Sequence, residues 1–386
     1  MNHIYNCHTH IFNIDHAPAR FLQGFAAKRI ANIAWALLQL PTGRRIASWL
    51  LSRVKNPNVS KYASFVYVGT MKSQNHVFRD LRSNYSKQDR FVILSLNMDF
   101  MGAGKANEAY AHQIYELKRV KKNNLNTCLP FYSVDPRAGS IYENAFMARD
   151  HIENKGFAGI KIYPALGFYP FDADMEETYK FAAGYNVPIM THCTRVGSYY
   201  LGKITPEMIK PAAFCPHASN WPKSYDTVDF PLKKNLTKNS LFCDYFSHPY
   251  NYARVLEVYP DLKICFAHAG DDPEIKKART VESHESWFTQ IKYLIETYPN
   301  VYTDISFTLS EKDIFEDLYE AIADSRYGHR ILFGTDYFMT LMKKKEKPLV
   351  NDFRRFLYSK PDGDKLWYAI TVKNPETYLE SAFYKP

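Results

Sequence analysis

The stretch Ile4-Tyr5-Asn6-Cys7-His8-Thr9-His10 is a short β-prone run that ends in two histidines. Side chains alternate along a strand, so His8 and His10 are expected to project from the same face. Such a pair can bind one metal ion from one side. An isolated His-x-His also occurs by chance in surface turns, so the interpretation depends on which residues stand at the ends of the other strand-like runs.

Seven further apolar runs lie along the chain, and helix-like stretches such as Ala109–Lys122 and Ser286–Tyr298 separate most of them. The eight runs are Ile4–His8, Phe91–Leu96, Cys128–Val134, Ala158–Tyr163, Val187–His192, Leu262–His268, Val301–Ile305 and Arg330–Phe333. Runs that are apolar throughout are typical of parallel strands covered on both sides. Eight strand–helix units predict an α/β fold, a TIM (β/α)8 barrel. The alternative is an open doubly wound sheet, but no GxGxxG motif follows any strand.

Two connections are too long for a single crossover helix. They cover about residues 18–75 and 196–250, after strands 1 and 5, and we interpret them as insertions into a single domain of residues 1–386. The first contains a helical pattern at 30–38, expected to cover the barrel mouth or to form a subunit contact; a membrane-surface helix is the alternative. The second is rich in aromatic residues, proline and lysine, and loops at that end of a barrel usually shape the substrate pocket.

The composition is that of a globular protein. Of the 386 residues, 46% are hydrophobic and 16% aromatic, which is ample for a large core. No run of about 18 apolar residues occurs, and the N-terminus lacks a signal-peptide pattern, so neither a membrane span nor secretion is expected. Cys7, Cys193 and Cys265 lie within strand-like runs and there is no CxxC, which predicts buried thiols in a reducing cytoplasm.

The formal net charge of +9 is interpreted as solvated surface, with clusters such as Lys343-Lys344-Lys345. A nucleic-acid footprint would require basic residues concentrated with aromatic ones or a known binding motif, and the sequence has neither. We therefore expect a small-molecule substrate and no nucleic-acid or membrane partner. The positive charge is compatible with an anionic substrate.

Three more titratable side chains stand at the ends of later runs: His192, His268 and Asp336. Barrel active sites are built at the C-terminal ends of the strands. A lone histidine at a strand end is usually structural, but three histidine-bearing strand ends and one aspartate in equivalent places predict a shared metal site.

Lys161 lies within Gly159-Ile160-Lys161-Ile162-Tyr163. If the two isoleucines pack against helices, the alternation of side chains turns Lys161 into the barrel and places Tyr163, a candidate substrate contact, on the same face. A buried lysine needs a partner or a changed charge state. Three roles stay open: pairing with Asp336 or a substrate carboxylate, a carbamate that bridges two metals, or pairing with a neighbouring acid.

Imidazole and carboxylate ligands suit Zn²⁺ or a similar divalent ion and leave a position open for water, whose pKa falls to about 7. Asp336 could take the proton of this water, and His268 could donate to a carbonyl or developing oxyanion. We therefore favour a metal-dependent hydrolase of an amide, ester or lactone. Non-oxidative decarboxylation of a small carboxylic acid fits the same residues. Arg137 and Arg195 follow strands and are candidate carboxylate clamps or surface arginines.

A non-catalytic, metal-containing binding protein is a further alternative. A structural zinc site normally closes its coordination with four protein groups. The residues predicted here instead resemble a site with room for a water molecule, which favours an enzyme.

The ordered series CHTHIF, GIKIYP, PIMTHC, LKICFAHAG, PNVYTDIS and RILFGTDYF resembles the amidohydrolase superfamily, and most closely the branch that contains aminocarboxymuconate-semialdehyde decarboxylase. The resemblance spans His8 to about Phe338 and is poor across the two insertions. It implies a TIM barrel with a divalent metal, commonly zinc, at the C-terminal mouth. It also implies one ion rather than two, because this branch is largely mononuclear, and it allows a homodimer, because these barrels often pair.

The resemblance also implies roles for individual residues. The metal ligands carried over by motif are His8, His10, His192 and Asp336. His268 corresponds to the sixth-strand histidine, an acid/base in mononuclear relatives and a second-metal ligand in binuclear ones. Lys161 matches the fourth-strand lysine that is carboxylated in binuclear members. Tyr163 departs from the pattern, because relatives in this branch often have histidine there.

Overall fold

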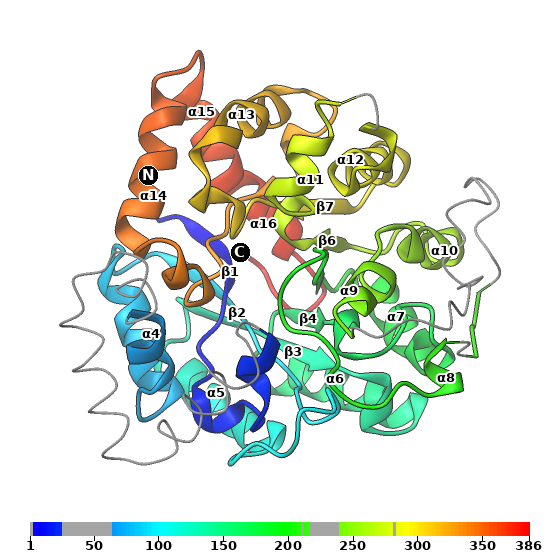
Figure 1. The fold of residues 1–386 in the computed structure, drawn as a ribbon. Helices are drawn as coiled ribbons and strands as arrows, with labels where there is room; N and C mark the ends of the chain where they lie inside the picture. Colours follow the sequence, from blue (N-terminus) through cyan, green and yellow to red (C-terminus); the bar gives the residue numbers. More distant parts are fainter. Residues whose placement is uncertain (1–2, 25–63, 210–211, 216–238, 281–282) are drawn as a thin grey trace.

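Eight parallel strands form one sheet in which each strand pairs with the next along the chain. The strands are β1 (Tyr5–Thr9), β2 (Arg90–Leu94), β3 (Cys128–Val134), β4 (Gly159–Ile162), β5 (Ile189–Thr191), β6 (Ile264–Phe266), β7 (Val301–Asp304) and β8 (Ile331–Leu332). The structure, a computed structural model, describes residues 3–24, 64–209, 212–215, 239–280 and 283–386. Within these ranges the strands occupy the middle of the molecule and the helices surround them (Figure 1).

The sheet closes on itself where the chain beyond β8 meets β1. The Cys7 amide donates to the carbonyl of Phe333 at 2.8 Å, and the Asp336 amide donates to the carbonyl of His8 at the same distance. A parallel bridge between Thr9 and Tyr337 continues the contact. The fold is therefore a TIM barrel, as the eight apolar runs predict.

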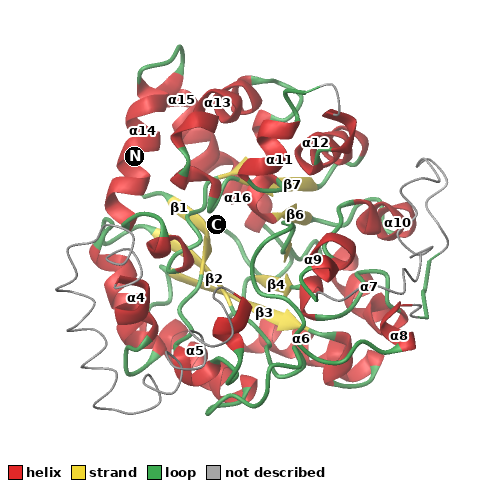
Figure 2. Cartoon of the chain, viewed as in Figure 1, coloured by secondary structure: helices red, strands yellow, loops and turns green. Residues whose placement is uncertain are grey.

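The helices form the outer layer, shown in red around the yellow strands in Figure 2. They are α4 (Gln74–Ser83), α5 (Tyr110–Asn123), α6 (Ile141–Lys155), α7 (Glu176–Gly184), α8 (Pro206–Ile209), α9 (Leu241–Phe246), α10 (Tyr250–Val258), α11 (Asp272–Lys277), α12 (Trp287–Thr297), α13 (Phe315–Ala323), α14 (Glu346–Tyr358), α15 (Gly363–Tyr368) and α16 (Asn374–Leu379).

Local sequence signals fix the ends of helix α6. Ser140 and Glu143 form a capping box at its start, in which each side chain accepts from the other residue's backbone amide. Gly156 ends it with a left-handed backbone at φ 73°. The helix therefore begins and ends where its sequence specifies.

Two apolar cores lie on either side of the strands. Ile160 and Ile162 of β4 belong to the outer core between sheet and helices. Cys7, Met190 and Cys265 belong to the smaller core inside the barrel. Alternation along β4 therefore turns Lys161, which is fully buried, into the barrel as predicted.

A register shift between Asn6 and Thr9 interrupts the pairing of β1 with β2. Asn6 pairs with Phe91 and Thr9 with Ile93, so β1 takes three steps where β2 takes two. A bulge of this kind bends the strand and re-aims its side chains. His8 lies within the bulge, at the point where β1 enters the site.

The eight predicted runs are all confirmed as strands, although most of the strands are shorter than the runs. The predicted helices Ala109–Lys122 and Ser286–Tyr298 correspond to α5 and α12. The helical pattern at 30–38 lies outside the described residues, as do large parts of the insertions 18–75 and 196–250, so these stay predictions.

All six cysteines are buried free thiols, which confirms the prediction for Cys7, Cys193 and Cys265. No helix in the described part of the chain is long and apolar enough to cross a membrane.

Candidate metal centre

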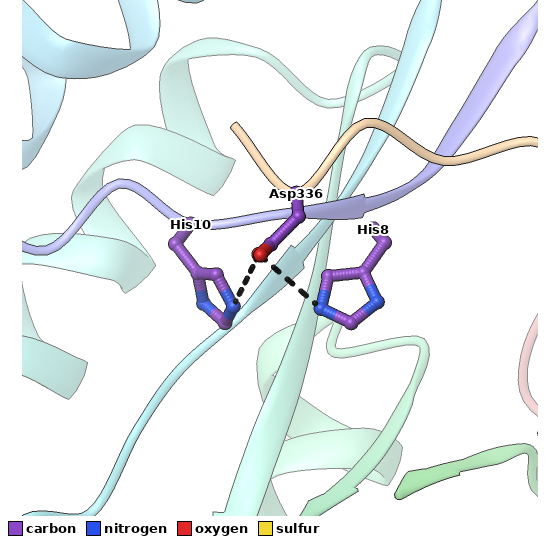
Figure 3. Close-up of side chains that lie close together, drawn as sticks. All are labelled: His8, His10 and Asp336. Atoms are coloured by element: carbon purple, nitrogen blue, oxygen red, sulfur yellow. Dashed lines mark ion pairs between the residues drawn. The ribbon is translucent and has the colours of Figure 1, made fainter. Parts of the chain in front are cut away.

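The side chains of His8, His10 and Asp336 converge at the C-terminal end of the barrel (Figure 3). Asp336 Oδ1 lies 3.3 Å from His10 Nε2 and 3.6 Å from His8 Nε2. All three residues are buried. Ligands at about 2.0–2.1 Å from a tetrahedral ion lie roughly 3.3 Å from one another. The observed spacing therefore suits one shared cation.

The hydrogen bonds on the other side of the two imidazoles fix their protonation. His10 Nδ1 lies 2.9 Å from the carbonyl oxygen of Leu94, which can only accept, so this nitrogen carries the proton. His8 Nδ1 lies 2.8 Å from Asp304 Oδ2 and likewise donates. Burial, followed by the neighbouring Lys161 and His10, holds the pKa of His8 well below its ordinary value, so its ring is neutral. In the neutral His8 ring the Nε2 atom therefore carries a lone pair.

Two of the converging atoms, His8 Nε2 and Asp336 Oδ1, have no hydrogen-bond partner among the described residues. The lone pair of His8 thus faces a carboxylate oxygen with no proton between them, and His10 Nε2 lies 3.3 Å from the same oxygen. Such an arrangement is unfavourable in a buried site unless a cation lies between the atoms. The donor set and its unpartnered atoms fit a divalent metal ion.

Asp304, at the end of β7, is a site residue that the sequence interpretation missed. Its carboxylate accepts from His8 Nδ1, from the His268 amide at 3.0 Å and from the Ser306 amide at 2.9 Å. It is completely buried and can form a second ligand group with His8 and His268. Because its oxygens already accept these bonds, we assign Asp304 to holding His8 in position. Its place at a strand end, within PNVYTDIS, was the available signal.

His268 lies beside the metal ligands. Its ring centroid is 4.7 Å from that of His8, and its Nδ1 lies 3.2 Å from the carbonyl oxygen of Ser306, to which it donates. Burial and the neighbouring His8 lower the pKa of His268 to about 4. A neutral imidazole whose Nδ1 carries the proton can accept a second proton at Nε2.

His192 is not a member of the close group of His8, His10 and Asp336. Its ring centroid is 5.3 Å from that of His268 and 4.0 Å from that of Tyr163. Its Nε2 lies 3.0 Å from the carbonyl oxygen of Val196, so His192 and the other three predicted ligands do not form one close group. Its role as a metal ligand stays a prediction.

Lys161 is fully buried, and its Nζ has no hydrogen-bond partner among the residues that the structure describes. Burial lowers the pKa of Lys161 to about 8, against the opposing effect of Asp304 and Asp336. The Lys161 amine therefore lies close enough to the candidate metal centre for the charges of Asp304 and Asp336 to affect its pKa. Its role as a carboxylated metal ligand stays a prediction.

The two candidate carboxylate clamps make contacts elsewhere. Arg137 donates to both carboxylate oxygens of Asp135, at 2.8 and 2.6 Å. Arg195 donates to Glu274 Oε1 at 2.8 Å, and its guanidinium carbon lies 4.5 Å from the Trp287 ring centroid. Neither arginine lines the cavity at the metal centre, and their role as substrate clamps stays a prediction.

A cavity of about 290 Å³ opens at the metal centre, and His10, His192, His268 and Asp336 line it. Tyr163 also lines it, and the Ser198 amide donates to its hydroxyl oxygen at 3.0 Å; its role as a substrate contact stays a prediction. Most of the remaining wall is apolar and consists of Phe12, Phe21, Leu96, Val196, Phe307, Met339 and Met342. The cavity is large enough for a small organic group.

Comparisons with solved structures find the same fold at low sequence identity. The 5-carboxyvanillate decarboxylase from Novosphingobium aromaticivorans, solved with bound manganese, is 11% identical with a TM-score of 0.55, covering 98% of this chain and 97% of its own. The 2,6-dihydroxybenzoate decarboxylase from Rhizobium is 11% identical with a TM-score of 0.51, covering 98% and 99%. An uncharacterised TIM-barrel protein from Bordetella bronchiseptica is 15% identical with a TM-score of 0.51, covering 97% and 98%.

One family model matches the chain by sequence. It is described as Amidohydrolase and covers residues 147–379, from helix α6 through to α16. No curated protein matches the chain.

Proposed function

The chain belongs to the amidohydrolase family, and on that premise we propose that it is a metal-dependent decarboxylase of a small carboxylic acid. The observation that carries this proposal is the convergence of the ligand atoms of His8, His10 and Asp336 at one apolar cavity. Two structural relatives of named activity are decarboxylases, which supports loss of CO₂ over the hydrolysis that the sequence favours.

We propose that His8, His10 and Asp336 hold one divalent ion. When bound, this ion supplies a Lewis acid for an anionic substrate group. Imidazole and carboxylate ligands suit Zn²⁺, and one structural relative contains manganese, so both ions are candidates. The other close group consists of His8, His268 and Asp304, and the Asp304 carboxylate already accepts hydrogen bonds from His8 Nδ1 and two backbone amides, which supports one ion rather than two.

The substrate class follows from the cavity. Its aromatic and aliphatic wall favours a planar, unsaturated or aromatic acid small enough for about 290 Å³. An apolar wall also removes water from the carboxylate, which favours its conversion into neutral CO₂.

The reaction needs one proton for each turnover. The bond between the carboxylate carbon and the substrate breaks, its electron pair forms a C–H bond with the incoming proton, and CO₂ leaves. Asp336 and His268 line the cavity and can carry this proton. His268 is neutral at pH 7 because of its low pKa, so it takes up a proton before it can deliver one.

Hydrolysis of an amide, ester or lactone is the second candidate. The family description favours it, and a carboxylate beside a divalent ion can serve a hydrolase equally well. The two candidates differ in their products, because hydrolysis places an oxygen atom from water in the product and decarboxylation does not.

The test is a product assay on protein loaded with Zn²⁺ or Mn²⁺, with a panel of small aromatic acids and their esters, amides and lactones in ¹⁸O-labelled water. We expect CO₂ in equal amount to the decarboxylated product and no ¹⁸O in that product. Replacing His10 by Ala should abolish turnover, and replacing His112, a half-buried histidine outside the cavity, by Ala should leave it unchanged. Incorporation of ¹⁸O with no release of CO₂ would establish the hydrolase instead.

A further inference from the structure

A buried polar cluster lies behind the metal centre, on the side of β1 that faces α4 and α14. It consists of Asn6 from β1, Tyr85 after α4, Thr335 after β8, and Glu346 at the first position of α14. Asn6, Thr335 and Glu346 are each at most 2% exposed. The proposed reaction uses none of these side chains. A buried polar cluster of this kind rigidifies the elements that it joins, provided that its groups are paired.

The hydrogen bonds of the cluster have a fixed direction. Asn6 Oδ1 accepts from the Thr335 amide at 3.1 Å, so the amide nitrogen of Asn6 points the other way. This nitrogen donates to the hydroxyl oxygens of Tyr85 at 2.9 Å and of Thr335 at 2.8 Å. Each hydroxyl group must therefore direct its own hydrogen elsewhere.

Both hydroxyl groups donate to one atom, Glu346 Oε1. The Tyr85 oxygen lies 2.5 Å from it and the Thr335 oxygen 2.7 Å. Glu346 Oε2 is buried and has no hydrogen-bond partner among the described residues. Glu346 is thus the acceptor at which the hydrogen bonds of the cluster end. Removing it would leave two buried hydroxyl groups without an acceptor.

The cluster reaches the metal centre through the chain after β8. Thr335 directly precedes Asp336, whose backbone has a left-handed conformation at φ 56°. The Asp336 amide donates to the carbonyl of His8, while its Oδ1 has no partner among the described residues that would hold the carboxylate in place. A left-handed backbone at a residue other than glycine persists only where its surroundings fix it. The position of the carboxylate therefore depends on how firmly Thr335 is held.

We propose that Glu346 is a positioning residue for the metal centre. By accepting from Thr335 it fixes the backbone from which Asp336 reaches the two histidines, and so joins the start of α14 to the ion. This inference rests on the proposed function, since it assigns Glu346 a role only if Asp336 holds an ion.

The test compares four variants by their affinity for Zn²⁺ alone, measured by competition with a chromophoric chelator. Glu346→Leu and Thr335→Val remove the bond that holds Thr335, and we expect Zn²⁺ affinity to fall at least about tenfold, as for other residues that orient metal ligands. Glu346→Gln keeps an acceptor at Oε1 and should bind within about threefold of the wild type. Tyr85→Phe is the matched control, because it removes the other hydroxyl group on the same carboxylate oxygen but leaves Thr335 held.

All four affinities are measured at a temperature well below the thermal unfolding midpoint of each variant. A loss of Zn²⁺ affinity is then distinguished from a loss of stability. Zn²⁺ affinity of Glu346→Leu and Thr335→Val equal to that of the wild type would overturn the inference and leave the proposed function intact. An equal loss in Tyr85→Phe would also overturn it, since the cluster would then be merely structural. Failure of the wild-type protein to bind Zn²⁺ would overturn both the inference and the proposed metal site.

Discussion

The proton on His8 decides whether this residue can bind an ion. Asp304 holds the proton on Nδ1 and thereby leaves the Nε2 lone pair facing Asp336. In Asp304→Asn the amide has a single acceptor oxygen, which the amides of His268 and Ser306 already require. Its amino group would then face His8 Nδ1 and favour the tautomer with the proton on Nε2. We expect Zn²⁺ affinity to fall about 10- to 100-fold, measured by chelator competition.

Asp89→Asn is the control for this change. Asp89 is also a buried carboxylate that accepts from backbone amides, those of Ile4 and Ser86, but it lies at the other end of β1. Its replacement should lower stability and leave Zn²⁺ affinity unchanged. Wild-type affinity in Asp304→Asn would show that Asp304 does not set the tautomer of His8.

Lys161 gives the stability of the ion-free protein a pH dependence of known sign. Burial lowers its pKa from 10.5 to about 8, so between these values the unfolded chain binds more protons than the folded one. Stability attributable to Lys161 therefore rises from pH 8 to about 10.5, and below pH 8 its charge costs about 3 kcal/mol. We expect Lys161→Met to be more stable than the wild type at pH 7, with a gap that closes at higher pH.

The measurement is urea unfolding of chelator-treated protein between pH 7 and about 10.5. Lys365→Met, which changes an exposed lysine, should show no such pH-dependent gap. A difference in unfolding free energy between Lys161→Met and the wild type that does not change with pH would contradict this prediction. It would mean that position 161 has no free amine that titrates, as expected for a carboxylated lysine.

The sequence predicts those candidate metal ligands that are recognisable by residue type and by position at a strand end. It misses residues whose role depends on partners far away in the sequence. His8, His10 and Asp336 stand at strand ends and carry ligand atoms, so the barrel brings them together. In the sequence, Glu346 is simply the first residue of a helical stretch. Only the hydrogen bonds that Thr335 and Asn6 donate to it show that it belongs to a buried polar cluster. Arg195 shows the converse, since its guanidinium group pairs with Glu274, which is remote in sequence, whereas Arg137 pairs with Asp135 two residues before it.

At the scale of elements, Gly334 allows the chain after β8 to pass close to β1. A Cβ atom at this position would lie 2.7 Å from the Cβ of His8 and 3.1 Å from that of Ser306. We expect Gly334→Ala to lower the free energy of unfolding by about 1–3 kcal/mol, because the added methyl group overpacks a tight contact. It should also weaken Zn²⁺ binding, because it displaces β1 at a metal ligand.

Gly184→Ala in α7 is the matched control, because a Cβ atom there has nothing within 4 Å. Helix propensity favours this change by roughly 0.5–1 kcal/mol. Denaturant unfolding and Zn²⁺ titration of both variants provide the comparison. Equal stability of the two variants would argue against a close approach at Gly334.

The elements themselves were predictable because buried parallel strands are apolar along their whole length. The ends of the strands were not predictable, since β6 and β8 end before His268 and Asp336, the residues that line the cavity. Both of those residues have positive φ, so the chain has already turned out of the sheet where they stand. The bulge in β1 has no signal in the sequence, because it depends on the pairing with β2.

At the scale of the whole molecule, the ion should link the two ends of the chain. Its proposed ligands come from β1 and from the segment after β8, which close the barrel against each other. An ion present at about 100 times its Kd should add about 2.7 kcal/mol to the free energy of unfolding. Unfolding with and without chelator measures this difference. His10→Ala should lose the effect and His112→Ala should keep it; equal stability with and without the ion would contradict the prediction.

The central claim is that one ion is bound by His8, His10 and Asp336. The most direct test is an anomalous difference map from crystals of the Zn²⁺- or Mn²⁺-loaded protein, collected at the absorption edge of the metal. We predict a single peak per chain, about 2.0–2.3 Å from Nε2 of both histidines and from the Asp336 carboxylate. A peak elsewhere, or none at this cluster in metal-loaded crystals, would contradict the claim.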